Sequence, residues 1–180
     1  MGGLFTPGPR VIEHQKAMVF VDGTNLFHRL AKAKLRLRSL SKLCRLYAQG
    51  RQILRVYLYT IEPYYEEAKK VHGDSVSKDI RVVFGDAINS GDGKIREKGV
   101  DALLVADLVY HAAAKNYDYA MLISADQDFS RALKRVEDFG CRTGVVSVCV
   151  AMPALLRQSC DDQYEIIEND LIANDIAERI

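Results

Sequence analysis

The sequence lacks long apolar runs and any excess of charge, and each absence excludes a class of protein. No apolar run approaches the roughly 18 residues that suggest a membrane span. The 25 Lys and Arg residues nearly balance the 24 Asp and Glu residues. Affinity for a polyanion therefore has to come from a local basic patch. The N-terminus shows no basic start followed by an apolar core, so we expect no secretory signal.

Cysteine and histidine patterns exclude several other kinds of site. The four cysteines contain no CxxC pair, and the four histidines show no metal-ligand spacing. No Ser/His/Asp set can be assembled from spacing, and no glycine-rich phosphate loop is present. Cysteines without a disulfide or metal pattern are typical of a reducing environment, so we expect a cytoplasmic protein.

The length of 180 residues predicts one domain with a substantial core. Residues 1–16 begin with a Gly- and Pro-rich stretch and are expected to be a flexible leader or an expression remnant. We place the folded domain at residues 17–167. Residues 168–180 are expected to form a C-terminal helix or tail.

Strand-like and helix-like segments alternate along this domain. Helical spacing of apolar residues separates the strand-like runs. Such alternation predicts an α/β fold with a mostly parallel central sheet of about five strands, covered by helices on both faces. The expected strands are 17–21, 53–59, 79–84, 119–124 and 141–150, with a short edge strand at 164–167.

Aspartates follow two of these strands at the point where each strand ends. Asp22 comes directly after the first strand, Asp126 and Asp128 follow the fourth, and Asp101 begins a helix. Because the carboxyl ends of parallel strands meet at one edge of the sheet, we expect these side chains to converge there. Taken singly, each aspartate is also explained as a helix cap, and for Asp128 the two interpretations stay open.

Converging carboxylates repel one another, and a divalent cation removes that conflict. Oxygen ligands without Cys or His favour Mg²⁺ or Mn²⁺ over zinc. A hard cation beside a basic segment is the equipment of phosphodiester hydrolysis. The glycine-rich stretch 85–101 is expected to be an exposed, mobile loop in which Lys94, Arg96 and Lys98 face one way if extended. Nucleic-acid contact and an ordinary solvated loop are both open interpretations.

Three segments together resemble the NYN domain, including its LabA-like (DUF88) branch, in the PIN-like nuclease superfamily. The resemblance covers about residues 17–167. A departure from the family pattern is Ala125, where the family has glycine. The segments are Val19-Phe-Val-Asp22-Gly-Thr-Asn25, then Lys98-Gly-Val-Asp101 with Asp107, and then Leu122-Ile-Ser124-Ala-Asp126-Gln-Asp128-Phe129.

The resemblance implies a Rossmann-like, three-layer PIN fold and metal-dependent cleavage of RNA, with single-stranded RNA as the expected partner. It makes Asp22, Asp101 and Asp126 the metal ligands and Asp128 a fourth acidic contributor or an outer-shell partner. A homo-oligomer or a regulatory protein partner stays open. The remaining implied roles are orientation of Asp22 or a metal-bound water by Asn25, a hydrogen bond from Ser124 to a carboxylate, phosphate contact by Lys98, and a structural role for Asp161.

Three alternatives compete with a ribonuclease. A haloacid-dehalogenase-like phosphatase has a nucleophilic Asp where this chain has Phe20, which cannot form an aspartyl-phosphate. A Toprim-like site needs a glutamate where this chain has Asp22. The third alternative is a PIN-like scaffold that binds RNA or a protein partner without catalysis.

Overall fold

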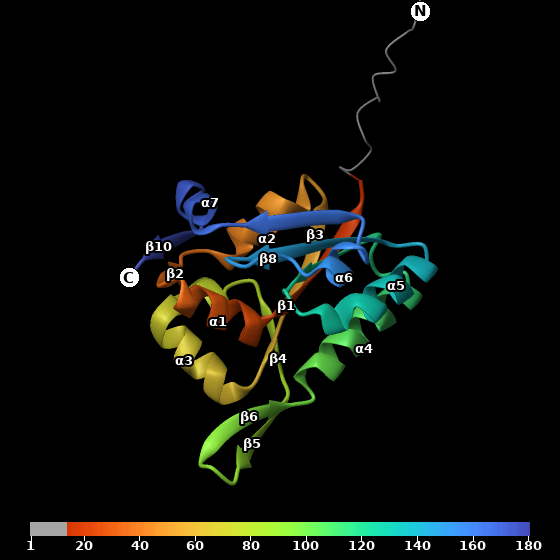
Figure 1. Cartoon of the computed structure of the whole chain (residues 1–180). Helices are drawn as coiled ribbons and strands as arrows, with labels where there is room; N and C mark the ends of the chain where they lie inside the picture. Colours follow the sequence, from red (N-terminus) through yellow and green to blue (C-terminus); the bar gives the residue numbers. More distant parts are fainter. Residues whose placement is uncertain (1–13) are drawn as a thin grey trace, which may run out of the picture.

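A six-stranded parallel sheet forms the centre of the computed structural model, which describes residues 14–180 (Figure 1). All five neighbouring pairs run parallel, in the order β4-β3-β1-β7-β8-β9. The sixth strand is the edge strand expected near residue 164. The strands are β1 (Lys16–Asp22), β3 (Gln52–Thr60), β4 (Arg81–Phe84), β7 (Tyr119–Ile123), β8 (Arg142–Val148) and β9 (Asp162–Ile166).

Helices cover both faces of this sheet, which confirms the expected three-layer α/β sandwich (Figure 1). Apolar residues of β1 alternate between two cores, because successive strand side chains point to opposite faces. Val19 and Val21 join the core under the first set of helices, whereas Met18 and Phe20 join the core under the second. The first set is α1 (Gly23–Lys32), α2 (Leu40–Ala48), α3 (Glu62–His72) and α7 (Glu168–Ala173); the second is α4 (Val100–Ala113), α5 (Ser130–Asp138) and α6 (Ala154–Arg157).

The glycine-rich segment after β4 is a β-hairpin, not a mobile loop. Strands β5 (Asp86–Ser90) and β6 (Lys94–Lys98) pair antiparallel and project from the body of the domain (Figure 1). The Tyr64 hydroxyl of α3 donates to the carbonyl of Ile95 at 2.9 Å. Glycine in a positive-φ conformation at Gly93 makes the tight turn. The sequence lacked a core pattern here because most of the hairpin is exposed.

A second pairing ties the C-terminal segment to the body. Strand β10 (Ala177–Arg179) pairs antiparallel with β2 (Leu35–Leu37), a strand the sequence did not predict. Segment 168–180 therefore holds helix α7 and then a strand. The expected leader lies mostly in residues 1–13, outside the described residues. Within residues 14–180 all four cysteines are free thiols, and none of the helices has the length and apolarity that crossing a membrane requires.

Asp107, an acidic residue in the apolar helix α4, has a hydroxyl as its partner. Its Oδ2 accepts a hydrogen bond from the Tyr59 hydroxyl of β3 at 2.8 Å. Burial and this carboxylate raise the pKa of Tyr59 far above its usual range. Asp107 is half-buried, and this hydrogen bond joins α4 to the sheet.

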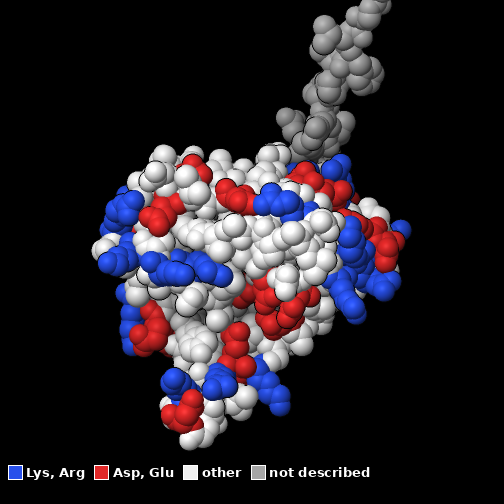
Figure 2. Space-filling model, in the orientation of Figure 1, with Lys and Arg blue, Asp and Glu red and all other residues white. Residues whose placement is uncertain are grey.

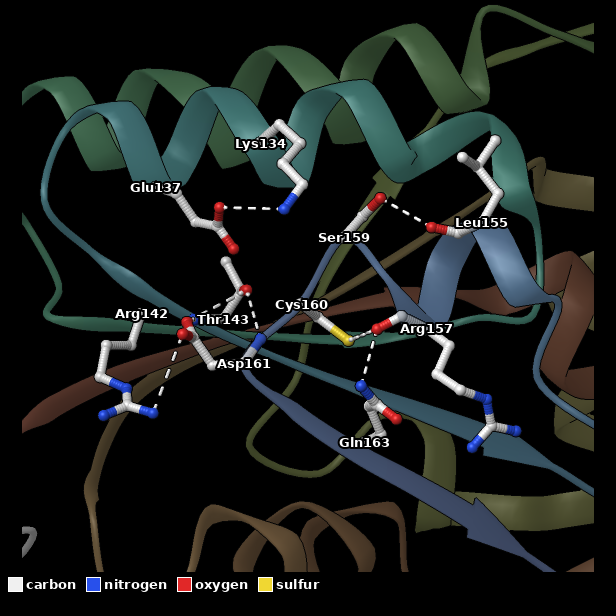
Figure 3. Close-up of polar contacts among 10 residues, drawn as sticks. All are labelled: Lys134, Glu137, Arg142, Thr143, Leu155, Arg157, Ser159, Cys160, Asp161 and Gln163. Carbon is white, nitrogen blue, oxygen red and sulfur yellow. Dashed lines mark hydrogen bonds and ion pairs between the residues drawn. The ribbon is translucent and has the colours of Figure 1, made fainter.

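Asp161 fixes the amino-terminal edge of the sheet (Figure 3). Its Oδ2 accepts from the Thr143 backbone N–H at 2.8 Å, and its own N–H donates to the Thr143 carbonyl at 3.1 Å. Arg142 forms an ion pair with the same carboxylate at 3.8 Å. Thr143 begins β8, whereas the aspartates of interest follow strand ends, so Asp161 is structural and remote from them.

His72 is buried at the end of α3 in its neutral form. Its Nδ1 accepts from the Leu37 backbone N–H at 3.0 Å, and its ring stacks on Phe27 with centroids 5.6 Å apart. Burial, with a smaller contribution from the charge of Arg36, lowers the pKa of His72 to about 4. Protonation would remove the acceptor and place a charge among apolar groups.

The folded state is therefore expected to lose stability as the pH falls. An unfolded His72 takes up its proton near pH 6.5 and the folded one only near 4, so stability is full above 6.5 and declines between these values. The free energy of unfolding should fall by about 2 kcal/mol between pH 8 and pH 5 through this residue. Chemical denaturation at both pH values measures it.

His72→Asn is the matched variant, because its amide oxygen still accepts a hydrogen bond but does not titrate. The variant should lose less stability than the wild type over the same pH range. An equal loss in both proteins would show that other groups carry the pH dependence.

Candidate active site

The sheet order reverses between β1 and β7, and the candidate site lies at this reversal. β1 pairs with β3 on one side and with β7 on the other. Open parallel sheets bind ligands just beyond the carboxyl ends of the strands at such a switch point. Asp22 is the last residue of β1, and Asp126 follows the end of β7 by three residues. The topology therefore brings together two of the aspartates selected from the sequence.

Asp22 is held in one orientation by the first turn of α1. Its Oδ1 accepts from the Asn25 backbone N–H at 3.0 Å, which makes it the N-cap of that helix, and its Oδ2 accepts from the Ser124 hydroxyl at 2.8 Å. The next residue, Gly23, has no room for a side chain. A Cβ there would lie 2.8 Å from the Tyr59 carbonyl oxygen, so glycine lets α1 start directly against β3.

Ser124 and Asn25 connect the β1 end of the site to the β7 end. The Ser124 oxygen also accepts from the Asp126 backbone N–H at 3.1 Å, and the Asn25 side-chain oxygen accepts from the Ala125 N–H at 3.3 Å. Asp126 in turn accepts from the Asp128 N–H at 2.9 Å and caps the short 3₁₀ helix Gln127–Phe129. The backbone after β7 is thus fixed by side chains that also touch or flank Asp22.

Asp101 and Glu97 bring further negative charge to this point from the other side. Asp101 lies in the first turn of α4, and Glu97 lies on β6 just before it. Burial, followed by the charges of Glu97, Asp126 and Asp128, raises the pKa of Asp101. The same charges reach Asp22, since Asp101 and Glu97 both contribute to its shift. Figure 2 shows the resulting acidic surface at the centre of the molecule, between α1 and α5.

Burial has the largest effect on Asp22. Only 6% of this residue is exposed, and burial raises its pKa to about 6 although the hydrogen bonds from Asn25 and Ser124 lower it. Part of that rise comes from the neighbouring carboxylates. A buried acid surrounded by like charges is the environment that a bound cation would relieve.

The donor set fits a hard cation, although the carboxylates are not gathered as a finished metal centre. All the acidic groups at the site offer oxygen atoms, as Mg²⁺ and Mn²⁺ prefer. Within residues 14–180 no three His, Cys, Asp or Glu side chains are grouped closely enough to hold an ion. Binding a cation therefore requires these carboxylates to draw together.

The three predicted basic contacts lie on the face of β6 opposite to Glu97. Lys94, Arg96 and Lys98 alternate along β6, so they share one face of the hairpin, and Glu97 points to the opposite face. Arg96 forms an ion pair with Asp92 at 3.4 Å. The three cations thus lie on the face away from the contact between Glu97 and α1.

Arg29 is a further source of positive charge, carried by α1. It lies one helical turn after Asn25, on the same side of the helix. Its Nε atom is buried without a hydrogen-bond partner among the described residues. By contrast, Arg36 and Arg38, which follow α1, pair with acidic residues of the C-terminal segment. Among the described residues, Arg29 forms no ion pair, unlike these two arginines.

Sequence reasoning missed Glu97 and Thr24. The Thr24 hydroxyl donates to Glu97 Oε2 at 2.5 Å, and this contact brings the hairpin to the first turn of α1. A signal was present in the alternation of residues 94–98. If the three basic side chains share one face of β6, Glu97 lies on the other face. Glu97 is also only four residues before Asp101 in the sequence.

A family model now gives this arrangement a name. The model of the NYN domain matches residues 16–168. The chain belongs to the NYN domain family. NYN domains belong to the PIN-like nuclease superfamily, and the matched range contains every acidic residue of the site.

A solved structure shares the overall fold of this chain. The crystal structure of a protein of unknown function from Vibrio parahaemolyticus aligns with a TM-score of 0.66, covering 87% of this chain and 96% of that one. Only 18% of the aligned residues are identical, so the likeness concerns the fold alone. No curated protein matches the sequence.

Removing the Asp22 charge is expected to stabilise the cation-free protein. Because the folded pKa of Asp22 lies above its ordinary value of 3.8, its contribution to stability is present below 3.8 and lost as the pH rises through about 6. Asp22→Asn keeps an oxygen that can cap α1. Thermal denaturation at pH 8 in chelator should show a gain on the order of 1 kcal/mol, and at pH 4 none.

Asp161→Asn is the matched control, because this carboxylate is paired with Arg142 at the opposite edge of the sheet. It should give no gain at pH 8. A destabilised Asp22→Asn protein at pH 8 would contradict the picture of Asp22 as a strained charge.

Proposed function

We propose that this NYN domain is a metal-dependent ribonuclease, which hydrolyses RNA phosphodiester bonds with Mg²⁺ or Mn²⁺. The observation that supports this most directly is the gathering of negative charge around the buried Asp22 at the switch point of the sheet. The nuclease superfamily of the domain supports the same reaction. We assign the chain to the LabA-like branch of the NYN family, because its Gly99-Val100-Asp101 segment at the start of α4 resembles the motif of that branch.

Each side chain then has a distinct task. Asp22, Asp101 and Asp126 would hold the cation, with Asp128 beside them or in the outer shell. Ser124 and the Asn25 backbone fix the Asp22 oxygens by hydrogen bonds, while the Asn25 amide group supports the turn at Ala125. A bound divalent cation supplies activation of water and neutralises charge on the phosphate. Arg29 offers a cation for the same phosphate group.

Glu97 is positioned to adjust the acidity of the site rather than to complete it. Its carboxylate is held by the Thr24 hydroxyl and raises the pKa of both Asp22 and Asp101. A raised pKa makes protonation of these carboxylates easier than for isolated ones. A cation bound by them would require the deprotonated form, because metal ligands must be deprotonated.

A second candidate function is RNA binding without cleavage, with the carboxylates serving the fold or a regulatory partner. One observation favours it: the described residues contain no group of three acidic side chains already arranged around an ion. The gathered charge and the raised pKa values weigh against it, because helix caps alone do not need several carboxylates at one point.

Cleavage of labelled single-stranded RNA tests the ribonuclease. With Mg²⁺ or Mn²⁺ the wild type should cut, and chelator should abolish the reaction. Asp126→Asn keeps the size of the side chain but removes a charge, so we expect a loss of at least about a hundredfold, the scale of losing one transition-state contact. DNA of the same sequence shows which nucleic acid is preferred.

Asp138→Asn provides the matched control, since this aspartate pairs with Arg135 on the surface of α5. It should cut as fast as the wild type. Equal cleavage by Asp126→Asn would point to another site, and no cleavage by folded wild type would favour the binding function.

The hairpin cations are expected to contact the backbone of longer RNA. Lys94→Ala combined with Lys98→Ala should weaken binding and make its salt dependence shallower, because each lost phosphate contact removes about 0.7 from the slope. Fluorescence anisotropy over a salt series measures both effects. Lys70→Ala is the control, because Lys70 is an exposed lysine paired with Glu67 on α3. An unchanged slope in the hairpin variant would exclude the hairpin from RNA contact.

A further inference from the structure

A groove of 720 Å³ runs between α1 and α3 beside the candidate active site. Its size falls in the range of sites that hold small organic groups. In Figure 2 the surface between these two helices is mostly free of charged side chains, in contrast to the acidic centre next to it. Its lining includes Thr24, Phe27, His28, Tyr64 and Val71. Two charged residues, Lys34 and Glu67, also line it, and Glu67 is paired with Lys70 at 2.6 Å.

The groove has rigid aromatic walls. Phe27 stacks on the buried ring of His72, with 5.6 Å between centroids, so one face of its ring is fixed from below. On the opposite wall, the Tyr64 hydroxyl bonds to the Ile95 carbonyl of the hairpin at 2.9 Å, which holds that ring in place. Two fixed rings suit a flat, partly apolar ligand, because little side-chain entropy is lost on binding.

The groove is continuous with the acidic site through one residue. Thr24 lines the groove, and its hydroxyl donates to Glu97 Oε2 at 2.5 Å. Glu97 in turn acts on the charges of Asp22 and Asp101. A ligand in the groove that contacts Thr24 is therefore separated from Glu97 by this one side chain.

The other end of the groove carries a positive charge. Lys34 follows α1, about 15 Å from Thr24 at the helical rise of 1.5 Å per residue. The groove thus has aromatic walls in its middle and a lysine at one end. A ligand with a flat apolar part and an anionic backbone matches this arrangement. A nucleotide in single-stranded RNA has that character, because its base offers a π face and its phosphates offer charge.

We propose that the groove between α1 and α3 binds an unpaired base of the RNA, adjacent to the phosphate that lies at the carboxylates. This inference rests on the proposed function and adds to it a binding site for one base of the substrate. Phe27 and Tyr64 provide the stacking surface, and Thr24 and His28 provide hydrogen bonds to the edge of the base. A base that is paired in a duplex cannot enter, so the groove selects single strands.

Filling the groove tests this proposal. Ala31 lies on the exposed side of α1 in the groove wall, so Ala31→Trp occupies the groove without touching the core. Ala113→Trp, at the exposed last residue of α4, is the matched control. Both changes are made in an Asp126→Asn background and assayed in chelator, so that cleavage does not disturb binding of a labelled single-stranded RNA oligomer.

Ala31→Trp is expected to weaken binding about tenfold, the typical scale of one lost base stack. Ala113→Trp should bind like its parent. Duplex RNA of the same sequence should bind equally to all three proteins. A second series replaces one base at a time by an abasic site, and one position should weaken binding by the same factor in the parent but have no further effect in Ala31→Trp.

The outcomes separate this inference from the proposed function. Unchanged binding by Ala31→Trp, or a flat abasic series, overturns the base site even if the wild type cleaves RNA. Equal weakening of single-stranded and duplex binding also overturns it, because the groove then acts on something other than a base. Groove-dependent binding without any cleavage by the wild type would support the base site while the ribonuclease proposal fails.

Discussion

β1 is hydrogen-bonded on both sides, and the connections on those two sides lie on opposite faces of the sheet. The connection from β1 to β3 contains α1 and α2, which cover one face of the sheet. The connection that enters β7 contains α4, which covers the other face. No connection therefore crosses above the carboxyl end of β1. Asp22 occupies the end of the strand that this constraint leaves open, and the positions of Asn25, Ser124 and Asp126 follow from it.

The same geometry makes the charge of Asp22 unfavourable for the stability of the fold. Asp22 caps a helix, which favours folding, yet it does so in a buried position surrounded by Asp101 and Glu97. A neutral cap would satisfy α1 equally well and avoid the repulsion. Retaining a carboxylate there is understandable if the protein uses the charge, since functional sites commonly keep groups that cost stability.

The sequence predicted the central sheet well, because strands buried on both faces leave continuous apolar runs such as residues 17–21 and 119–123. It missed the β5–β6 hairpin and the β2–β10 pair, which are short or exposed and lack that signal. Asp22, Asp101 and Asp126 could be selected because each stands at the end or start of an element. The alternation of residues 94–98 indicates which face of β6 carries Glu97, but its closeness to the site depends on a tertiary contact with Thr24 that the sequence does not show. The Tyr59 partner of Asp107 likewise depends on how α4 packs on β3.

The acidic groups are carried by two mechanically different parts of the protein. Asp22 and Asp126 are attached to the ends of central strands, whereas Glu97 belongs to a projecting ribbon that continues through Gly99 into the helix bearing Asp101. Hydrogen bonds from the Thr24 and Tyr64 side chains hold this ribbon against the rest of the domain. The distance between the two pairs of carboxylates therefore depends on where the hairpin is held against α1 and α3.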